Sequence, residues 1–123
     1  MIHDGARPFL TTDLIHDGLT AAQVTGAAVA AVPVKDTIKL GDDDGMVRET
    51  LNRHQVWITQ TPQVFRSDII TRAHENIADD VTDDASMVER LSYRVKLYTG
   101  SYNNIKITTP EDLALAEIIA RGI

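Results

Sequence analysis

Four polar clusters lie in stretches whose composition predicts loops at strand ends, where open α/β sheets bind their ligands. An Asp or Thr side chain in such a loop can hold a metal ion or an alcohol hydroxyl, and an Arg or Lys can hold a phosphate. The set is compatible with a local basic pocket for a small phosphorylated ligand. The clusters are His3-Asp4-Gly5-Ala6-Arg7-Pro8, Lys35-Asp36-Thr37-Ile38-Lys39 together with Arg53, Thr82-Asp83-Asp84-Ala85-Ser86, and Asn103 to Asp112.

Lys106 is the residue of these clusters that ordinary structure explains least. It lies between two Ile residues in an extended segment, directly before a helix start, where an anion is attracted. The others have structural alternatives. Asp4 equally suits a loop cap, Arg7 favours a salt bridge, and the polar arm that carries Thr37 and Arg53 equally suits exposure to solvent.

The third cluster is typical of a helix N-terminus, because Asp and Ser side chains favour the positive end of the helix dipole. We therefore predict that Asp83, Asp84 and Ser86 begin a helix. Thr82 lies just before that helix, and both a structural and a binding role stay open for it.

Composition excludes several classes of protein. The chain has 123 residues, a net charge of −6 and no Cys, which excludes a disulfide scaffold, a thiolate zinc site and a cysteine nucleophile. The acidic balance argues against a sequence-independent nucleic-acid binder. No apolar run approaches the roughly 20 residues of a membrane span, and no signal peptide is recognisable, so a cytoplasmic protein without membrane contact is predicted.

The pattern of apolar residues predicts alternating helices and strands, and hence an α/β fold in one domain. The strand at 27–34 is a continuous run of small and β-branched residues, typical of a strand buried on both faces in a parallel sheet. The other predicted elements are helices at 11–25, 67–77, 84–91 and from 109 onward, strands at 56–60 and 94–98, a turn at 61–63, and short extended pieces at 2–4 and 104–107.

A hairpin is predicted between residues 34 and 50, around the turn Gly41-Asp42-Asp43-Asp44-Gly45. Its arms carry few large apolar residues, so it has little core of its own. We therefore expect it to project from the body and to meet another chain.

Taken together and in order, the motifs resemble the 2-C-methyl-D-erythritol 4-phosphate cytidylyltransferase family, over Ile2 to about Ala120. Besides the four clusters, the resemblance is carried by Thr50-Leu51-Asn52-Arg53 and Gln60-Thr61-Pro62-Gln63-Val64-Phe65. It implies a truncated Rossmann-like nucleotidyltransferase sheet with a projecting β-hairpin arm at about 34–56. Residues 1–123 would form the C-terminal part of a single cytidylyltransferase domain. The family's glycine-rich nucleotide loop has no counterpart here, so the chain is expected to be an incomplete form that is inactive by itself.

The resemblance also implies an activity, in which 2-C-methyl-D-erythritol 4-phosphate is joined to CTP with release of pyrophosphate, a step of non-mevalonate isoprenoid biosynthesis. Lys106 and Arg53 would be catalytic and would hold the substrate phosphate for attack on CTP. Substrate binding would fall to Asp4, Arg7, Thr37, Thr61 and Thr82, with Asp4 and Thr82 on the erythritol hydroxyls. Asp4 would also lie near the Mg²⁺ that accompanies CTP.

In the family the arm crosses to the second subunit of a homodimer, so Thr37 and Arg53 would complete the partner's site. Two alternatives stay open. The ribitol 5-phosphate cytidylyltransferases share the Thr-Pro-Gln and Lys-Ile-Thr-Thr type motifs, although Ala6 and the stretch Thr50-Leu51-Asn52-Arg53 favour the erythritol enzyme. The chain could instead be a non-catalytic dimerisation fragment.

Overall fold

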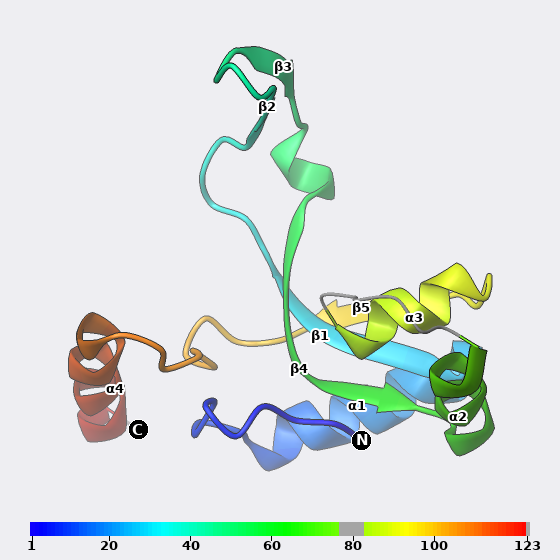
Figure 1. Ribbon diagram of the computed structural model, residues 1–123. Helices are drawn as coiled ribbons and strands as arrows, with labels where there is room; N and C mark the ends of the chain where they lie inside the picture. Colours follow the sequence, from blue (N-terminus) through cyan, green and yellow to red (C-terminus); the bar gives the residue numbers. More distant parts are fainter. Residues whose placement is uncertain (77–82, 123) are drawn as a thin grey trace.

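The structure, a computed structural model, describes residues 1–76 and 83–122 (Figure 1). A three-stranded sheet has the order β4-β1-β5, and a separate two-stranded sheet is formed by β2 and β3. The α/β prediction is confirmed. The elements in chain order are α1 (Thr12–Thr25), β1 (Ala27–Pro33), β2 (Lys39–Gly41), β3 (Val47–Thr50), the 3₁₀ turn η1 (Arg53–Gln55), β4 (Trp57–Phe65), α2 (Ser67–Asn76), α3 (Asp84–Arg90), β5 (Lys96–Thr99) and α4 (Pro110–Gly122).

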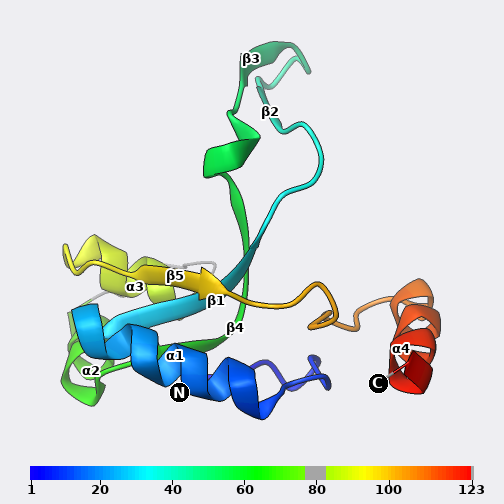
Figure 2. The ribbon, with the colours of Figure 1, turned by 180° about the vertical axis from the view of Figure 1, so that it is seen from behind.

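β1 is the central strand and is buried on both faces, as predicted. Alternate side chains point to opposite faces of a strand. Ala27 and Val29 pack with residues of α2 and α3. Ala28 and Ala30 pack with Tyr98 of β5 and with α1. The run of small side chains therefore lets helices approach the sheet closely from both sides (Figure 2).

The sheet is mixed, which corrects the expectation of a parallel sheet. β1 runs parallel to β5 but antiparallel to β4. The antiparallel neighbour arises because the arm between β1 and β4 returns the chain beside β1 without a crossover helix. A buried apolar run does not reveal which way its neighbours run, so composition could not separate the two arrangements.

The predicted turn at 61–63 is also wrong, because β4 continues through these residues to Phe65. Pro62 has no N–H to give to a ladder and is usually found at edges or bulges. Here it follows a cis peptide bond, within an irregularity where the pairing with β1 shifts between Val29 and Ala31. The bulge accommodates the proline while the strand goes on. Ile2 pairs with Gln63 along the other edge of β4, through two backbone hydrogen bonds of 2.9 Å.

Helix termini follow their sequence signals closely. The Thr11 hydroxyl accepts a hydrogen bond from the Leu14 N–H, and Gly26 ends α1 in the left-handed conformation at φ 85°. α4 begins with a reciprocal cap in which the Thr109 hydroxyl accepts from the Asp112 N–H and the Asp112 carboxylate accepts from the Thr109 N–H. Hydrogen bonds from the backbone and hydroxyl of Thr108 hold the pKa of Asp112 below its usual range. No helix in the described part of the chain is long and apolar enough to cross a membrane.

The predicted hairpin is confirmed and projects from the body as an arm (Figures 1 and 2). β2 and β3 form its tip, and every residue of both strands is exposed. The Asp42 carboxylate closes the turn by accepting hydrogen bonds from the N–H groups of Asp44 and Met46. At the base of the arm, the Tyr102 hydroxyl donates to the Pro33 carbonyl at 2.6 Å.

Candidate functional site

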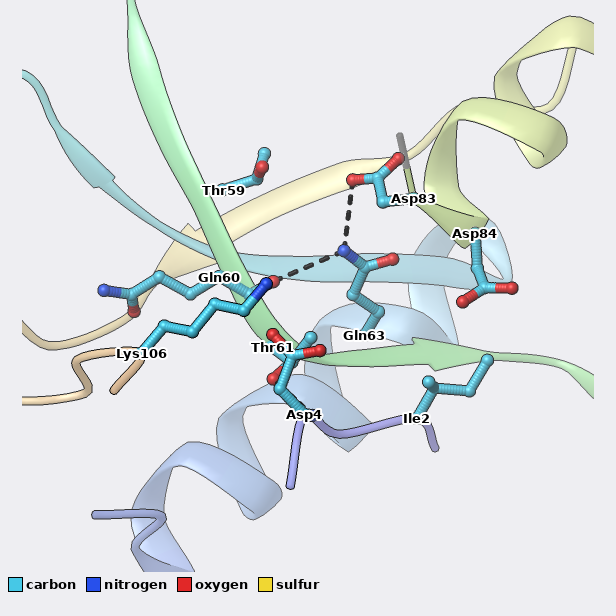
Figure 3. A pocket seen from close by; sticks show the side chains of 9 residues that line it. All are labelled: Ile2, Asp4, Thr59, Gln60, Thr61, Gln63, Asp83, Asp84 and Lys106. Carbon is cyan, nitrogen blue, oxygen red and sulfur yellow. Dashed lines mark hydrogen bonds between the residues drawn. The ribbon is translucent and has the colours of Figure 1, made fainter. Parts of the chain in front are cut away.

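A cavity of about 230 Å³ opens beside β4 (Figure 3). Its walls come from four places in the sequence: the N-terminal loop, β4, the start of α3, and the segment between β5 and α4. Three of the predicted site residues therefore share one cavity. The lining residues are Ile2, Asp4, Thr59, Gln60, Thr61, Gln63, Asp83, Asp84 and Lys106.

The N-terminal loop is held to β4 and to the segment after β5. The Asp4 N–H donates to the Thr61 hydroxyl at 2.9 Å. Arg7 donates to the Asp4 carboxylate at 3.1 Å and to the Asn104 carbonyl at 2.7 Å, with its side chain only 12% exposed. Arg7 thus lies behind the cavity wall and orients Asp4, which matches its salt-bridge alternative.

Two buried amides fasten the segment after β5 to β4. The Gln60 carboxamide pairs with the Ser101 backbone, donating to its carbonyl at 2.9 Å and accepting from its N–H at 3.4 Å. The Asn104 amide, which is fully buried, donates to the Gln60 side chain and to the Thr61 carbonyl. A little further on, the Ile107 N–H donates to the Ala6 carbonyl.

The hydrogen bonds of Asn104 and Ile107 fix the backbone on either side of Lys106. The Lys106 side chain extends into the cavity toward Thr61 and Asp4 (Figure 3). Within the described chain, Lys106 has no hydrogen-bond or ion-pair partner in the cavity, whereas Asp4 has Arg7 and Asp84 has His74. An unpaired ammonium group in a polar cavity is suited to bind an anion such as a phosphate.

Asp83 caps α3, as the sequence predicts: its carboxylate accepts from the Ser86 N–H and hydroxyl. It also accepts from the Gln63 side chain at 3.1 Å, which joins α3 to β4 across the cavity. Asn104 belongs to one of the predicted clusters, and Gln60 and Gln63 to a motif of the resemblance, but none of the three was assigned a role in the site. Thr82, predicted to bind substrate, lies outside the described residues.

Thr37 and Arg53 do not line this cavity. Both belong to the arm, where Arg53 is exposed and donates to the Lys35 carbonyl at 3.1 Å. The structure thus brings Asp4, Thr61 and Lys106 together and leaves the two arm residues away from the cavity of their own chain.

Asp4 was expected near Mg²⁺. Among the described residues, no three His, Cys, Asp or Glu side chains cluster as a metal site, and the Asp4 carboxylate is engaged by Arg7. One carboxylate that already has a cationic partner does not make a protein-built Mg²⁺ site. The metal role of Asp4 stays a prediction, and no step below depends on it.

Replacing Gly100 with alanine is expected to destabilise the fold. The added Cβ would overlap the Gln60 amide oxygen, so Gln60 would have to leave its bonds to Ser101 and Asn104. We expect the free energy of unfolding, measured with urea, to fall by about 1–3 kcal/mol. Gly5→Ala is the matched control, because its Cβ would meet nothing within 4 Å in the described structure. Equal stability of the two variants would contradict the role given to Gln60.

A family model described as IspD, 2-C-methyl-D-erythritol 4-phosphate cytidylyltransferase, matches residues 1–122. Curated relatives of that name include one from Dehalococcoides mccartyi, 53% identical over 121 residues, which are 98% of this chain and 53% of the relative. Another, from Clostridium novyi, is 50% identical over 126 residues, covering 100% of this chain and 54% of the relative. The chain thus spans about half the length of the curated relatives it matches.

Solved structures agree with the fold. The 4-diphosphocytidyl-2C-methyl-D-erythritol synthase of Anaerococcus prevotii is 38% identical and has a TM-score of 0.89, covering 97% of this chain and 57% of that one. The 2-C-methyl-D-erythritol 4-phosphate cytidylyltransferase of Thermus thermophilus is also 38% identical, with a TM-score of 0.84, covering 97% and 60%. Because the family model matches residues 1–122, this chain belongs to the 2-C-methyl-D-erythritol 4-phosphate cytidylyltransferase family.

Proposed function

We propose that the chain supplies the alcohol-phosphate site of an enzyme that joins 2-C-methyl-D-erythritol 4-phosphate to CTP and releases pyrophosphate, as part of isoprenoid biosynthesis. The observation that carries this proposal is the cavity that Lys106 shares with Asp4 and Thr61. The cavity offers a cation for a phosphate, and a carboxylate and a hydroxyl for alcohol groups.

The reaction depends mainly on positive charge and on the alignment of the two reacting phosphate groups. A phosphate oxygen of the alcohol phosphate attacks the α-phosphorus of CTP, a new P–O bond forms, and the bond to pyrophosphate breaks. The attacking oxygen is already an anion near neutral pH, so no strong general base is needed. The barrier lies in bringing two polyanions together in line, and fixed cations lower it. Lys106 would hold the attacking phosphate in that alignment.

The cavity of one chain supplies too little positive charge for this task. Among its described lining residues, Lys106 is the single cation, beside the carboxylates of Asp4, Asp83 and Asp84. We propose that the arm at 34–56 of a second copy brings Arg53 and Thr37 to this cavity in a homodimer. The arm's exposed strands and its projection from the body support that arrangement (Figure 1).

We further propose that residues 1–123 act as the C-terminal part of a single cytidylyltransferase domain. In that case the 123 residues alone neither bind CTP tightly nor turn over. Mg²⁺ would accompany the CTP phosphates. A cytoplasmic location is proposed because CTP is a cytoplasmic metabolite.

The test uses a hybrid protein, in which this chain replaces the matched 121 residues of the Dehalococcoides mccartyi relative. Pyrophosphate release is measured with CTP and either 2-C-methyl-D-erythritol 4-phosphate or ribitol 5-phosphate. We expect kcat/KM to favour the erythritol substrate by at least about 100-fold, because a site built to hydrogen-bond particular hydroxyls rejects mismatched ones. A preference for ribitol 5-phosphate would assign the chain to that reaction, and an inactive hybrid would favour a non-catalytic dimerisation role.

A further inference from the structure

The Thr61 side chain forms part of the cavity wall (Figure 3), and its hydroxyl has two hydrogen-bond partners. The backbone N–H of Asp4 donates to it at 2.9 Å. The His3 ring lies on another side, with Nδ1 at 2.9 Å from the same oxygen. A hydroxyl has one proton to donate and two lone pairs that can accept. These two contacts therefore determine which hydrogen bond the Thr61 hydroxyl can still make to a ligand.

The contact of the second ring nitrogen of His3 determines which nitrogen carries the ring proton and to which atom the Thr61 hydroxyl donates. Nε2 lies 2.9 Å from the Arg7 carbonyl oxygen, which can only accept. In an imidazole with one ring proton, that proton is therefore on Nε2, and Nδ1 is an acceptor. The Thr61 hydroxyl must then donate its proton to Nδ1. Because the Asp4 N–H occupies one lone pair, a single lone pair remains toward the cavity.

We propose that His3 is a positioning residue that directs the Thr61 hydroxyl proton away from the cavity, so that Thr61 accepts a hydrogen bond from a ligand and does not donate one. A phosphate oxygen has no proton to offer at this position, whereas an alcohol hydroxyl has. On the function proposed above, His3 thus sets the direction of the substrate, with the phosphate toward Lys106 and a hydroxyl toward Thr61.

The ring tautomer can be measured without turnover. Two-bond ¹H–¹⁵N correlation spectra of the 123-residue chain, recorded at about pH 8.5, distinguish protonated from unprotonated ring nitrogens, and His3→Gln assigns the His3 signals. We expect a protonated Nε2 and an unprotonated Nδ1. A protonated Nδ1 would overturn the proposal.

Two substitutions separate the contacts of His3 in the hybrid protein. Gln places an amide where Nε2 reaches Arg7 but loses the contact with Thr61, and Asn keeps an acceptor close to the position of Nδ1. We expect His3→Gln to raise the KM for 2-C-methyl-D-erythritol 4-phosphate about tenfold, with kcat and the KM for CTP within about twofold. His3→Asn should restore most of the loss, and His16→Gln, on the exposed face of α1, serves as the control.

A double-mutant cycle tests whether His3 acts through Thr61. Once Thr61→Val has removed the hydroxyl, His3→Gln should change the KM no further. A tenfold effect that persists in the Thr61→Val background would overturn the proposal, as would a failure of His3→Asn to restore binding. If the hybrid has no activity, the proposed function fails, and the ring tautomer still decides the role of His3.

Discussion

Lys106→Ala is expected to lower kcat for cytidylyl transfer in the hybrid protein by about 100- to 1000-fold, the usual effect of removing one fixed charge that stabilises a transition state. Lys106 is the single cation among the described residues of its own chain that line the cavity, so no other side chain in that lining can take over its charge. Rates at saturating CTP and alcohol phosphate measure the effect.

Lys96→Ala is the matched control for Lys106. Lys96 lies on β5, is exposed, and does not line the cavity, so its removal should leave the rate within about twofold. Lys106→Arg tests geometry as well as charge: a guanidinium keeps the charge but places its donors differently, and partial activity is expected. A Lys106→Ala rate equal to that of the control would remove Lys106 from the site.

Arg53→Ala is expected to lower kcat/KM for the alcohol phosphate by about 100-fold while leaving the Kd for CTP within about threefold, because the guanidinium would hold the phosphate of the alcohol and not the nucleotide. Arg48→Ala is the control within the arm, since Arg48 lies in β3 near its tip. A wild-type kcat/KM in Arg53→Ala would exclude Arg53 from the reaction.

Mixing the two inactive variants tests whether the arm serves a second copy. If each site combines Lys106 of one subunit with Arg53 of the other, a dimer of Arg53→Ala and Lys106→Ala subunits contains one intact site. Random pairing should then restore about a quarter of the wild-type activity. Activity that does not rise above that of the separate variants would place both residues in one chain's site or exclude a shared one.

Much of the fold could be predicted because the positions at which helices begin and end depend on interactions within a few residues. Thr11, Gly26 and Thr109 behave as caps in the structure, and Asp83 caps α3. In each case a hydroxyl, a carboxylate or a glycine satisfies or relieves the backbone within a few residues, so the sequence window contains the cause.

The features that could not be predicted from the sequence depend on contacts between residues far apart in the chain. Pro62 indicates a turn by its own chemistry, and only the irregular pairing with β1 shows how β4 passes through it. No structural role for Gln60 or Asn104 could be predicted from the sequence, yet both are buried and they join β4 to the segment after β5, 44 residues apart in sequence. The signal that could have found them is Gly100, where close approach of the Gln60 side chain leaves no room for a Cβ.

In the candidate site, too, residue types could be predicted to matter from the sequence, whereas their placement depends on long-range contacts. The types of Asp4 and Lys106 pointed to hydroxyl and phosphate recognition, only the family resemblance added Thr61, and the structure places the three residues in one cavity. That Arg7 lies behind the wall, paired with Asp4, depends on its contact with the Asn104 carbonyl 97 residues away. Which of several suitable side chains faces the ligand is decided by tertiary contacts, which residue type and spacing do not encode.

In the function proposed above, this cavity presents an alcohol phosphate to CTP. The most direct measurement is the ³¹P spectrum of the hybrid protein incubated with CTP and 2-C-methyl-D-erythritol 4-phosphate. We expect the phosphate monoester signal to be replaced by the two coupled signals of a new diphosphate linkage, with one equivalent of pyrophosphate. In Lys106→Ala this change should be slowed by about 100- to 1000-fold. Pyrophosphate released while the monoester signal persists, or equal rates in the two proteins, would contradict the proposed function.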